Sequence, residues 1–512
     1  MILLKHGDLI DGTGSVPRRA DVLIEGKTIR DVGVLDHVSD AEMVDCQGLA
    51  VCPGFIDVHS HSDLEALQHR SEKICQGVTT EVVGNCGFSL FPNLPLENLV
   101  PSFEIFKDRA GQQWDDAGSY FDDVEKQRSH THLAALTGHS SLRAHVIGMS
   151  ADKLEGATQR QAEAVLDSCL EQGSIGLSTG LNEVPSSYGD LDELVKLCRV
   201  VRRYDGFYTS HLRDYKFHII EAVEEALEIG RRAGVPVQLS HLQTVGRKNW
   251  DKMDVVLDLV DHALQEGVDV GIDAYPYLAG SCNLTQLLPI WSLEGGTEPL
   301  LERLADADTY RQIATETEEN MGNDWDDILL CTVPGRGDLI GQTVRDIADS
   351  RARVGVDTAL DLLMENNARV QIISFNQSEE NLRKVLSHPC TSVITDGLVV
   401  DGKSHPRTFG TYPKFLGEYV RDKGWMTLEK AVWKATGLPA QRFGLAGRGV
   451  VATGNWADLV VFSPEKIGTH ATYENPDLAP EGIEHVLVNG RWALRHGNPT
   501  AGLAGTALRH RA

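Results

Sequence analysis

The chain has 512 residues, of which 41% are hydrophobic and 6% aromatic, and its 74 acidic side chains outnumber its 48 lysines and arginines, which leaves a formal charge of −26. The composition is that of a globular protein, and the length suggests two to four structural units, although an α/β barrel can take about 250 residues as one. Because phosphate-bearing partners are bound through clusters of basic residues, we expect neither nucleic acid nor an anionic membrane as a partner.

The sequence also gives an expectation for location. No stretch reaches the ~20 apolar residues that span a bilayer, and charges interrupt the first residues before the apolar core of a signal peptide can form. The nine cysteines include no C-x-x-C pair, so neither a disulfide framework nor a zinc knuckle is indicated. We therefore expect a cytoplasmic protein.

Short strands with tight turns are predicted at both ends of the chain. Apolar and polar residues alternate between glycine turns at 20–25 and again at 457–462, a pattern typical of hairpins. Neither end has enough strands to bury a core alone. We therefore expect residues 1–53 and 440–512 to pair into one small β-unit.

Between these ends, short apolar runs alternate with amphipathic helices, as in a parallel sheet with helical crossovers. The helical spacing is clearest at 158–171, 191–203, 219–233 and 253–265. Strands are predicted at 54–58, 78–83, 133–137, 174–177, 207–209, 235–239, 268–272 and 391–394. Eight strand–helix units predict a (β/α)8 barrel over residues 54–439.

The interval between the seventh and eighth strands is too long for a simple connection. It contains an acidic, partly helical segment, so we expect an insertion at about 283–361 over the mouth of the barrel. Pieces rich in glycine and proline at 279–289 and 402–413 flank the same end. They are predicted to form lid loops.

Residues that bind metals follow five of the eight predicted strands: His59, His61, Cys86, His211, His241 and Asp396. His59 and His61 are two residues apart, so in an extended chain both rings point to one face. The carboxyl ends of barrel strands converge on one mouth, where these side chains would meet. Each residue alone has an ordinary structural interpretation. A structural role, however, gives no reason for all of them to gather at one end.

Eight short motifs surround these residues, at 54–63, 77–87, 178–181, 210–214, 239–242, 273–277, 395–397 and 405–407. Together they resemble the D-aminoacylases (N-acyl-D-amino-acid deacylases) of the amidohydrolase superfamily. The resemblance covers nearly the whole chain. It implies a barrel with a small β-sandwich built from both termini, an insertion between strands seven and eight, and hydrolysis of the amide bond of N-acyl-D-amino acids.

The resemblance implies a tight zinc site and a second, weaker metal site, formed respectively by Cys86, His211 and His241, and by His59, His61 and Asp396. Asp396 also resembles the catalytic acid/base. Zinc with an open coordination position can lower the pKa of its water to ~7. A carboxylate beside the metal can take the water proton and return it to the leaving nitrogen.

Many amidohydrolases bridge two metals with a carboxylated lysine at the end of the fourth strand. This chain has no lysine at 176–185, which disfavours the hydantoinase and dihydroorotase types. Cys86 or Glu183 is then left as the anionic ligand. We favour Cys86, because residues 84–87 match the ligand loop of the family.

Arg407 resembles the family residue that clamps the substrate carboxylate, a task that suits a bidentate guanidinium. The alternative is that Arg407 pairs with an acidic residue of the insertion and braces a lid. The family usually has tyrosine where this chain has Glu183 and lysine where it has Gln243, so we expect a second anionic group on the substrate to be disfavoured. Tyr275 and Tyr277 are further substrate-binding residues that the resemblance implies.

Three other functions are considered. Residues 176–180 match the G-x-S-x-G pattern of serine hydrolases, but the chain then runs into a loop instead of a helix. A metal-free scaffold barrel is disfavoured, because all six ligand positions hold competent residues. The stronger alternative is another hydrolase using the same site, acting on a cyclic amide, a lactone or a different acylated amine.

Overall fold

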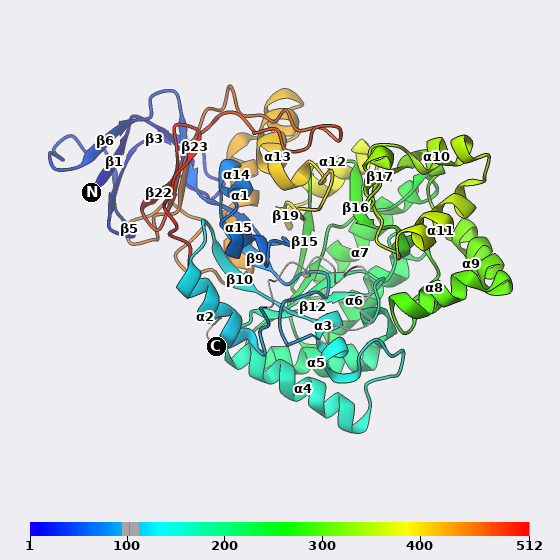
Figure 1. The fold of residues 1–512 in the computed structure, drawn as a ribbon. Coiled ribbons are helices and arrows are strands. Elements are labelled where there is room, and N and C mark those ends of the chain that lie inside the picture. Colours follow the sequence, from blue (N-terminus) through cyan, green and yellow to red (C-terminus); the bar gives the residue numbers. More distant parts are fainter. Residues whose placement is uncertain (95–101, 103–111, 511–512) are drawn as a thin grey trace.

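A computed structural model of the protein describes residues 1–94, 102 and 112–510. Its centre is a ring of parallel strands with helices outside it (Figure 1). The ring strands are β8 (Phe55–Asp57), β9 (Val78–Val83), β10 (His132–Ala135), β12 (Gly176–Gly180), β13 (Phe207–His211), β14 (Val237–Leu239), β15 (Val270–Ala274) and β19 (Thr391–Val393). These correspond to the eight strands predicted from the sequence, so the (β/α)8 barrel is confirmed.

Parallel pairing continues around the ring. β8, β9 and β10 form one sheet, and β11 (Thr137–Gly138), which follows β10 directly, pairs with β12 in a second sheet that ends at β19. The ring closes where Ser60 bridges to Gly397 and the Asp396 amide donates to the His59 carbonyl at 2.9 Å. Residues that follow the first strand therefore lie beside residues that follow the last.

The barrel helices pack against the outside of the ring. They include α1 (Glu72–Cys75), α2 (Ala117–Gln127), α3 (His139–Ile147), α4 (Gly156–Glu171), α5 (Leu191–Arg202), α6 (Ile219–Ala233), α7 (Met253–Gln265), α12 (Glu379–Ser387), α13 (Arg407–Lys414), α14 (Leu428–Ala435) and α15 (Gly437–Arg442). Their apolar faces meet the ring strands in one core, where Leu177, Val223 and Leu239 are fully buried. This burial is the main stabilisation of the barrel.

Strands from the two ends of the chain share one of two terminal sheets, as the sequence predicts. One sheet contains β5 (Thr28–Gly33), β4 (Asp21–Glu25), β1 (Ile2–Lys5) and β6 (Glu42–Asp45). The other contains β23 (Asn498–Pro499), β22 (Arg491–Arg495), β21 (Ile483–Val488), β20 (Leu459–Phe462), β7 (Ala50–Pro53), β2 (Asp8–Leu9) and β3 (Arg18–Arg19). β20 pairs antiparallel with β7, which joins the termini. We propose 53/54 and 439/440 as the domain boundaries.

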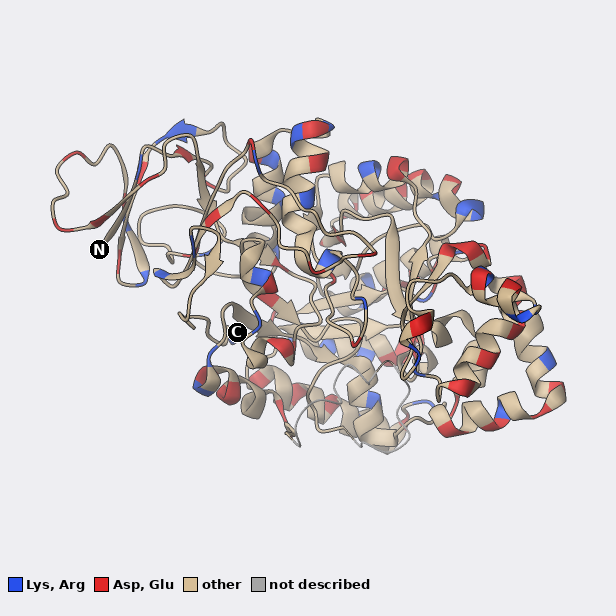
Figure 2. Ribbon diagram, turned by 45° about the horizontal axis from the view of Figure 1, so that its top comes forward, with Lys and Arg blue, Asp and Glu red and all other residues tan. Residues whose placement is uncertain are grey.

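The insertion between β15 and β19 lies on the side of the barrel opposite the terminal sheets (Figure 1). It consists of β16 (Ala279–Asn283), β17 (Ile328–Thr332), β18 (Gln371–Phe375), α8 (Thr297–Ala305), α9 (Ala307–Asn320), α10 (Val344–Arg351) and α11 (Gly355–Glu365). β16 and β18 extend beyond the predicted range of 283–361, because five-residue strands give little sequence signal. Charged residues lie mainly along the outer helices (Figure 2). No helix among the described residues is long and apolar enough to cross a bilayer.

Candidate metal centre

The first ring strand delivers two histidines to the mouth of the barrel. His59 is fully buried, and its Nε2 lies 3.2 Å from Cys86 Sγ and 3.5 Å from Asp396 Oδ1. His61 Nε2 lies 3.2 Å from the same Asp396 oxygen. The closure of the ring between the first and last strands therefore brings both histidines to Asp396.

Cys86 lies on a tight loop after β9. A Cβ atom at Gly84, where φ is +76°, would lie 2.3 Å from the Leu136 carbonyl oxygen, so this position requires glycine. Ser178 of β12 holds the loop, because its hydroxyl donates to the Gly84 carbonyl and accepts from the Gly87 amide at 3.1 Å. The serine of the G-x-S-x-G pattern thus braces the Cys86 loop from within a strand, and the geometry gives no support to the serine-hydrolase alternative.

The Cys86 thiol is surrounded by histidines. Its Sγ lies 3.5 Å from His241 Nε2. Burial raises the pKa of the Cys86 thiol, but His59 and His211 outweigh burial and hold that pKa well below its ordinary value. These surroundings favour the thiolate, the form of cysteine that binds metals.

Three of the site residues have left-handed backbone conformations: Cys86 (φ 53°), His241 (φ 33°) and Asp396 (φ 47°). Residues other than glycine rarely adopt this region. Strain of about 1–3 kcal/mol per residue persists only where the surroundings hold it, and it clusters at functional sites. Here the Asp396 amide is tied to the His59 carbonyl at 2.9 Å, and the His241 amide to Asp273 Oδ1 at 2.6 Å.

All six predicted ligand residues meet at the mouth. Their ligand atoms lie within 4.8 Å of one another in three overlapping groups: His59, His61 and Cys86; Cys86, His211 and His241; and His59, His241 and Asp396. Within this cluster, four buried ring nitrogens have no hydrogen-bond partner among the described residues: His59 Nδ1, His61 Nδ1, His211 Nε2 and His241 Nδ1. Imidazole nitrogen and thiolate sulfur are donors that zinc prefers, so the residues present fit a zinc ion.

Asp273 contacts two histidines of this cluster and holds them in place, a role that was not predicted from the sequence. Its Oδ1 lies 3.3 Å from His59 Nδ1 and accepts the His241 amide, while its Oδ2 accepts from Gln238 at 2.9 Å. A carboxylate behind a histidine fixes the orientation of the ring. The only sequence signal was the position of Asp273 within the 273–277 motif.

Asp396 and Arg407 form a buried ion pair, with 2.9 Å between Oδ2 and Nη1. Burial raises the pKa of the Asp396 carboxyl, but Arg407 and His59 hold it well below its usual range. The Arg407 guanidinium also stacks over the Tyr275 ring, 4.6 Å from the centroid. The lid alternative would need Arg407 to pair with an acidic residue of the insertion. Among the described residues its acidic partner is Asp396.

The metal cluster opens into a cavity of about 690 Å³, lined among others by Glu183, Gln243, Tyr275 and Arg407. The Tyr275 hydroxyl donates to Gln243 Oε1 at 3.4 Å. Tyr277 is not among the residues that line the cavity, and its hydroxyl donates to the Pro406 carbonyl at 3.3 Å. It supports the turn before Arg407, and its role in binding substrate stays a prediction.

Glu183 lies in the cavity wall, where Ser102 donates to its carboxyl at 2.8 Å. Burial raises the pKa of Glu183 to about 8, which favours the neutral form of this side chain over the negative charge expected from the sequence. None of the metal-ligand groups found among the described residues includes Glu183. The geometry therefore favours Cys86 as the anionic ligand.

Known proteins resemble this chain over nearly its whole length. The amidohydrolase family matches residues 42–280 and 295–493. The D-aminoacylase of Alcaligenes xylosoxydans xylosoxydans is 35% identical over 96% of this chain and 93% of its own, and the N-acyl-D-glutamate deacylase of that organism is 37% identical over 96% and 92%. The crystal structure of N-acyl-D-glutamate deacylase from Bordetella bronchiseptica, with zinc and a phosphonate mimic of the tetrahedral intermediate, has a TM-score of 0.87 and 33% identity and covers 99% of both chains.

Proposed function

Because the chain belongs to the amidohydrolase family, we propose that it is a zinc-dependent hydrolase that cleaves N-acyl-D-amino acids to a carboxylate and a free D-amino acid. The observation that carries this proposal is the convergence of Cys86, His211 and His241 beside Asp396. The relatives with 35% and 37% identity, a D-aminoacylase and an N-acyl-D-glutamate deacylase, support the substrate class.

We assign the tight zinc site to Cys86, His211 and His241, whose thiolate and imidazole donors suit that ion. The other three residues of the cluster, His59, His61 and Asp396, are left for a second, weaker position. When bound, zinc supplies a Lewis acid that polarises the scissile carbonyl and makes water nucleophilic near neutral pH.

The Asp396 carboxylate accepts the proton of the attacking water and delivers it to the leaving nitrogen. Arg407 and the histidines keep the Asp396 pKa low, so that the carboxylate is ready to accept that proton. Arg407 Nη1 is engaged by Asp396, whereas its buried Nε has no hydrogen-bond partner among the described residues. That N–H is available to the α-carboxylate of the substrate.

The test is an assay of amine release by zinc-loaded protein against N-acyl-D- and N-acyl-L-amino acids, hydantoins and lactones. Release from D substrates alone is the expected result. Opening of a hydantoin or a lactone, without release from any N-acyl-D-amino acid, would assign the same site to the cyclic-substrate alternative.

We also infer a cytoplasmic protein that acts on a small molecule and has no nucleic-acid or membrane partner. The nine cysteines are free thiols, which suits a reducing compartment, and the charge of −26 disfavours contact with phosphate groups. Cell fractionation tests the location.

A further inference from the structure

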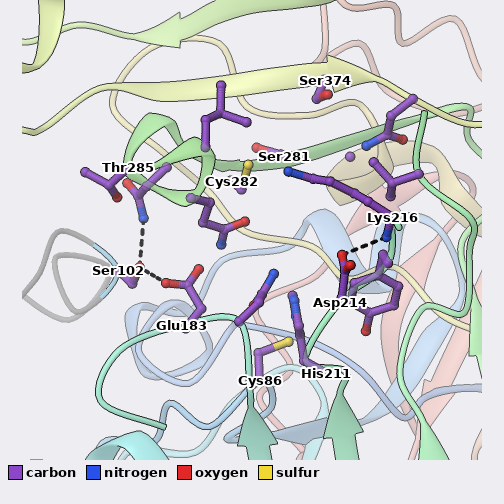
Figure 3. A pocket seen from close by; sticks show the side chains of 18 of the residues that line it. Cys86, Ser102, Glu183, His211, Asp214, Lys216, Ser281, Cys282, Thr285 and Ser374 are labelled. Carbon is purple, nitrogen blue, oxygen red and sulfur yellow. Dashed lines mark hydrogen bonds between the residues drawn. The ribbon is translucent and has the colours of Figure 1, made fainter. Parts of the chain in front are cut away.

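Lys216 places a cation in the cavity. The sequence analysis of substrate charge considered Gln243 and Glu183 and did not include this lysine. It lies in the loop between β13 and α6 and lines the cavity that contains Cys86 and His211. Figure 3 shows its side chain extending across the cavity, so that the amine lies beside Ser281 and Cys282, away from the metal cluster.

The Lys216 ammonium has no anionic partner among the described residues, since none of their carboxylates lies within 4.0 Å of it. Its one hydrogen bond to a described residue is a long contact of 3.4 Å to the Asn320 carbonyl. Asp214, the nearest acidic residue in sequence, uses Oδ1 and Oδ2 to accept the main-chain amides of Lys216 and His218, each at 2.8 Å. Asp214 therefore shapes the loop and does not pair with the ammonium.

The two arginines that line the same cavity are already paired. Arg213 binds Glu225 at 2.8 Å, and Arg407 binds Asp396 at 2.9 Å. Lys216 is thus a cation of the cavity lining that has no anionic partner among the described residues. A partly buried ammonium that lacks a partner is costly, and an anionic group of a ligand would offset that cost.

A buried amide lines the same cavity. Asn376 is 7% exposed, its Oδ1 has no hydrogen-bond partner among the described residues, and its side-chain nitrogen donates to none of them. Nearby Asn323 is already fixed by donation to Ser374 at 2.9 Å. Asn376 therefore has an unused N–H donor, and Lys216 has unused ammonium protons. Such donors suit the two oxygens of a carboxylate.

We propose that Lys216 and Asn376 form a subsite for a second carboxylate of the substrate. This inference rests on the proposed function and specifies its substrate class: N-acyl-D-amino acids with a carboxylate besides the α-carboxylate, on the side chain or on the acyl group. It reverses the expectation drawn from Gln243, because the cation missing at that position is supplied by the neighbouring loop after β13, which is hydrogen-bonded to the Gln243 loop through Val245 and Tyr215.

The test compares kcat/KM within two isosteric pairs. N-acetyl-D-glutamate against N-acetyl-D-glutamine probes the side chain, and N-succinyl-D-alanine against N-succinamoyl-D-alanine probes the acyl group. We expect the wild type to prefer the acid in one pair by roughly 10- to 150-fold, the range of a charge-assisted hydrogen bond. The pair that shows the preference locates the second carboxylate.

Variants decide whether Lys216 causes this preference. Lys216→Met should reduce the acid/amide ratio at least ~10-fold, whereas Lys216→Arg should keep most of it. Lys196→Met, at an exposed position of α5, is the matched control and should leave the ratio unchanged. Melting temperature and zinc content show whether each variant is folded.

Two results would overturn the inference: equal rates for acid and amide in both pairs, or a preference that survives Lys216→Met in a folded, zinc-loaded protein. Failure of the proposed function is a different result, in which the wild type releases no amine from any N-acyl-D-amino acid.

Discussion

Asp396 and Arg407 are joined by an ion pair of 2.9 Å between Oδ2 and Nη1, and both side chains are almost fully buried. This pair links the residue proposed to move the proton to the residue proposed to bind the substrate carboxylate. Charges at this separation interact strongly when water is excluded. A change at either residue should therefore affect both chemistry and binding.

Replacing Asp396 with asparagine should reduce kcat by at least ~100-fold, the low end for loss of a general acid/base. The fold and the tight zinc should be retained, because Cys86, His211 and His241 stay in place. Steady-state kinetics alongside zinc analysis checks this expectation. Near-wild-type turnover would remove Asp396 from the mechanism.

Replacing Arg407 with alanine should raise KM for N-acyl-D-amino acids by roughly 10- to 150-fold, because a charge-assisted contact to the α-carboxylate is lost. Arg407→Ala should also lower kcat, since the Asp396 carboxylate loses its partner. The control substrate is N-acetyl-D-alaninamide, which lacks the carboxylate. An equal rise of KM for the amide would contradict the clamp.

Replacing Cys86 with alanine should abolish tight zinc binding, because the thiolate is the anionic member of the proposed site. Glu183→Gln is the control and should keep the zinc, since Glu183 belongs to none of the ligand groups found. Metal content after dialysis against a chelator distinguishes the two variants. Full zinc stoichiometry in Cys86→Ala would refute the assignment.

The predictable part of the site follows from one geometric rule. His59, His211 and Asp396 could be brought together from sequence because they follow barrel strands, whose carboxyl ends meet at one mouth. Lys216 could not be assigned to the site from sequence, because its side chain reaches the cavity from a loop that has no periodic pattern. The raised pKa of Glu183 depends on burial, which a sequence does not display.

The bounds of the insertion could not be predicted from the sequence either. β16 and β18 pair across a long interval of chain, and the antiparallel partner of a five-residue strand is fixed by tertiary packing instead of local propensity. Helices such as α6, by contrast, carry a strong apolar repeat and were located to within a turn.

Acid stability should depend on Glu193, which ties α5 to α3. Its carboxyl accepts from Arg143 Nη1 at 2.7 Å and lies 2.8 Å from His139 Nε2. Burial raises the pKa of Glu193, but His139 and Arg143 outweigh burial and lower it from 4.5 to about 2. The folded state therefore favours the ionised form. This stabilisation is present above pH 4.5 and is lost as the pH falls toward 2.

Glu193→Gln should consequently destabilise the protein at pH 7 by about 3–5 kcal/mol, since Arg143 is left buried without its counter-charge. The gap in melting temperature between this variant and the wild type should narrow as the pH falls below 4.5. In that range Glu193 of the unfolded wild type binds a proton, whereas the folded protein does not take it up until the pH approaches 2. Glu171→Gln, at an exposed position at the end of α4, serves as the control. A gap that stays constant from pH 7 to pH 3 would show that the Glu193 charge does not stabilise the fold.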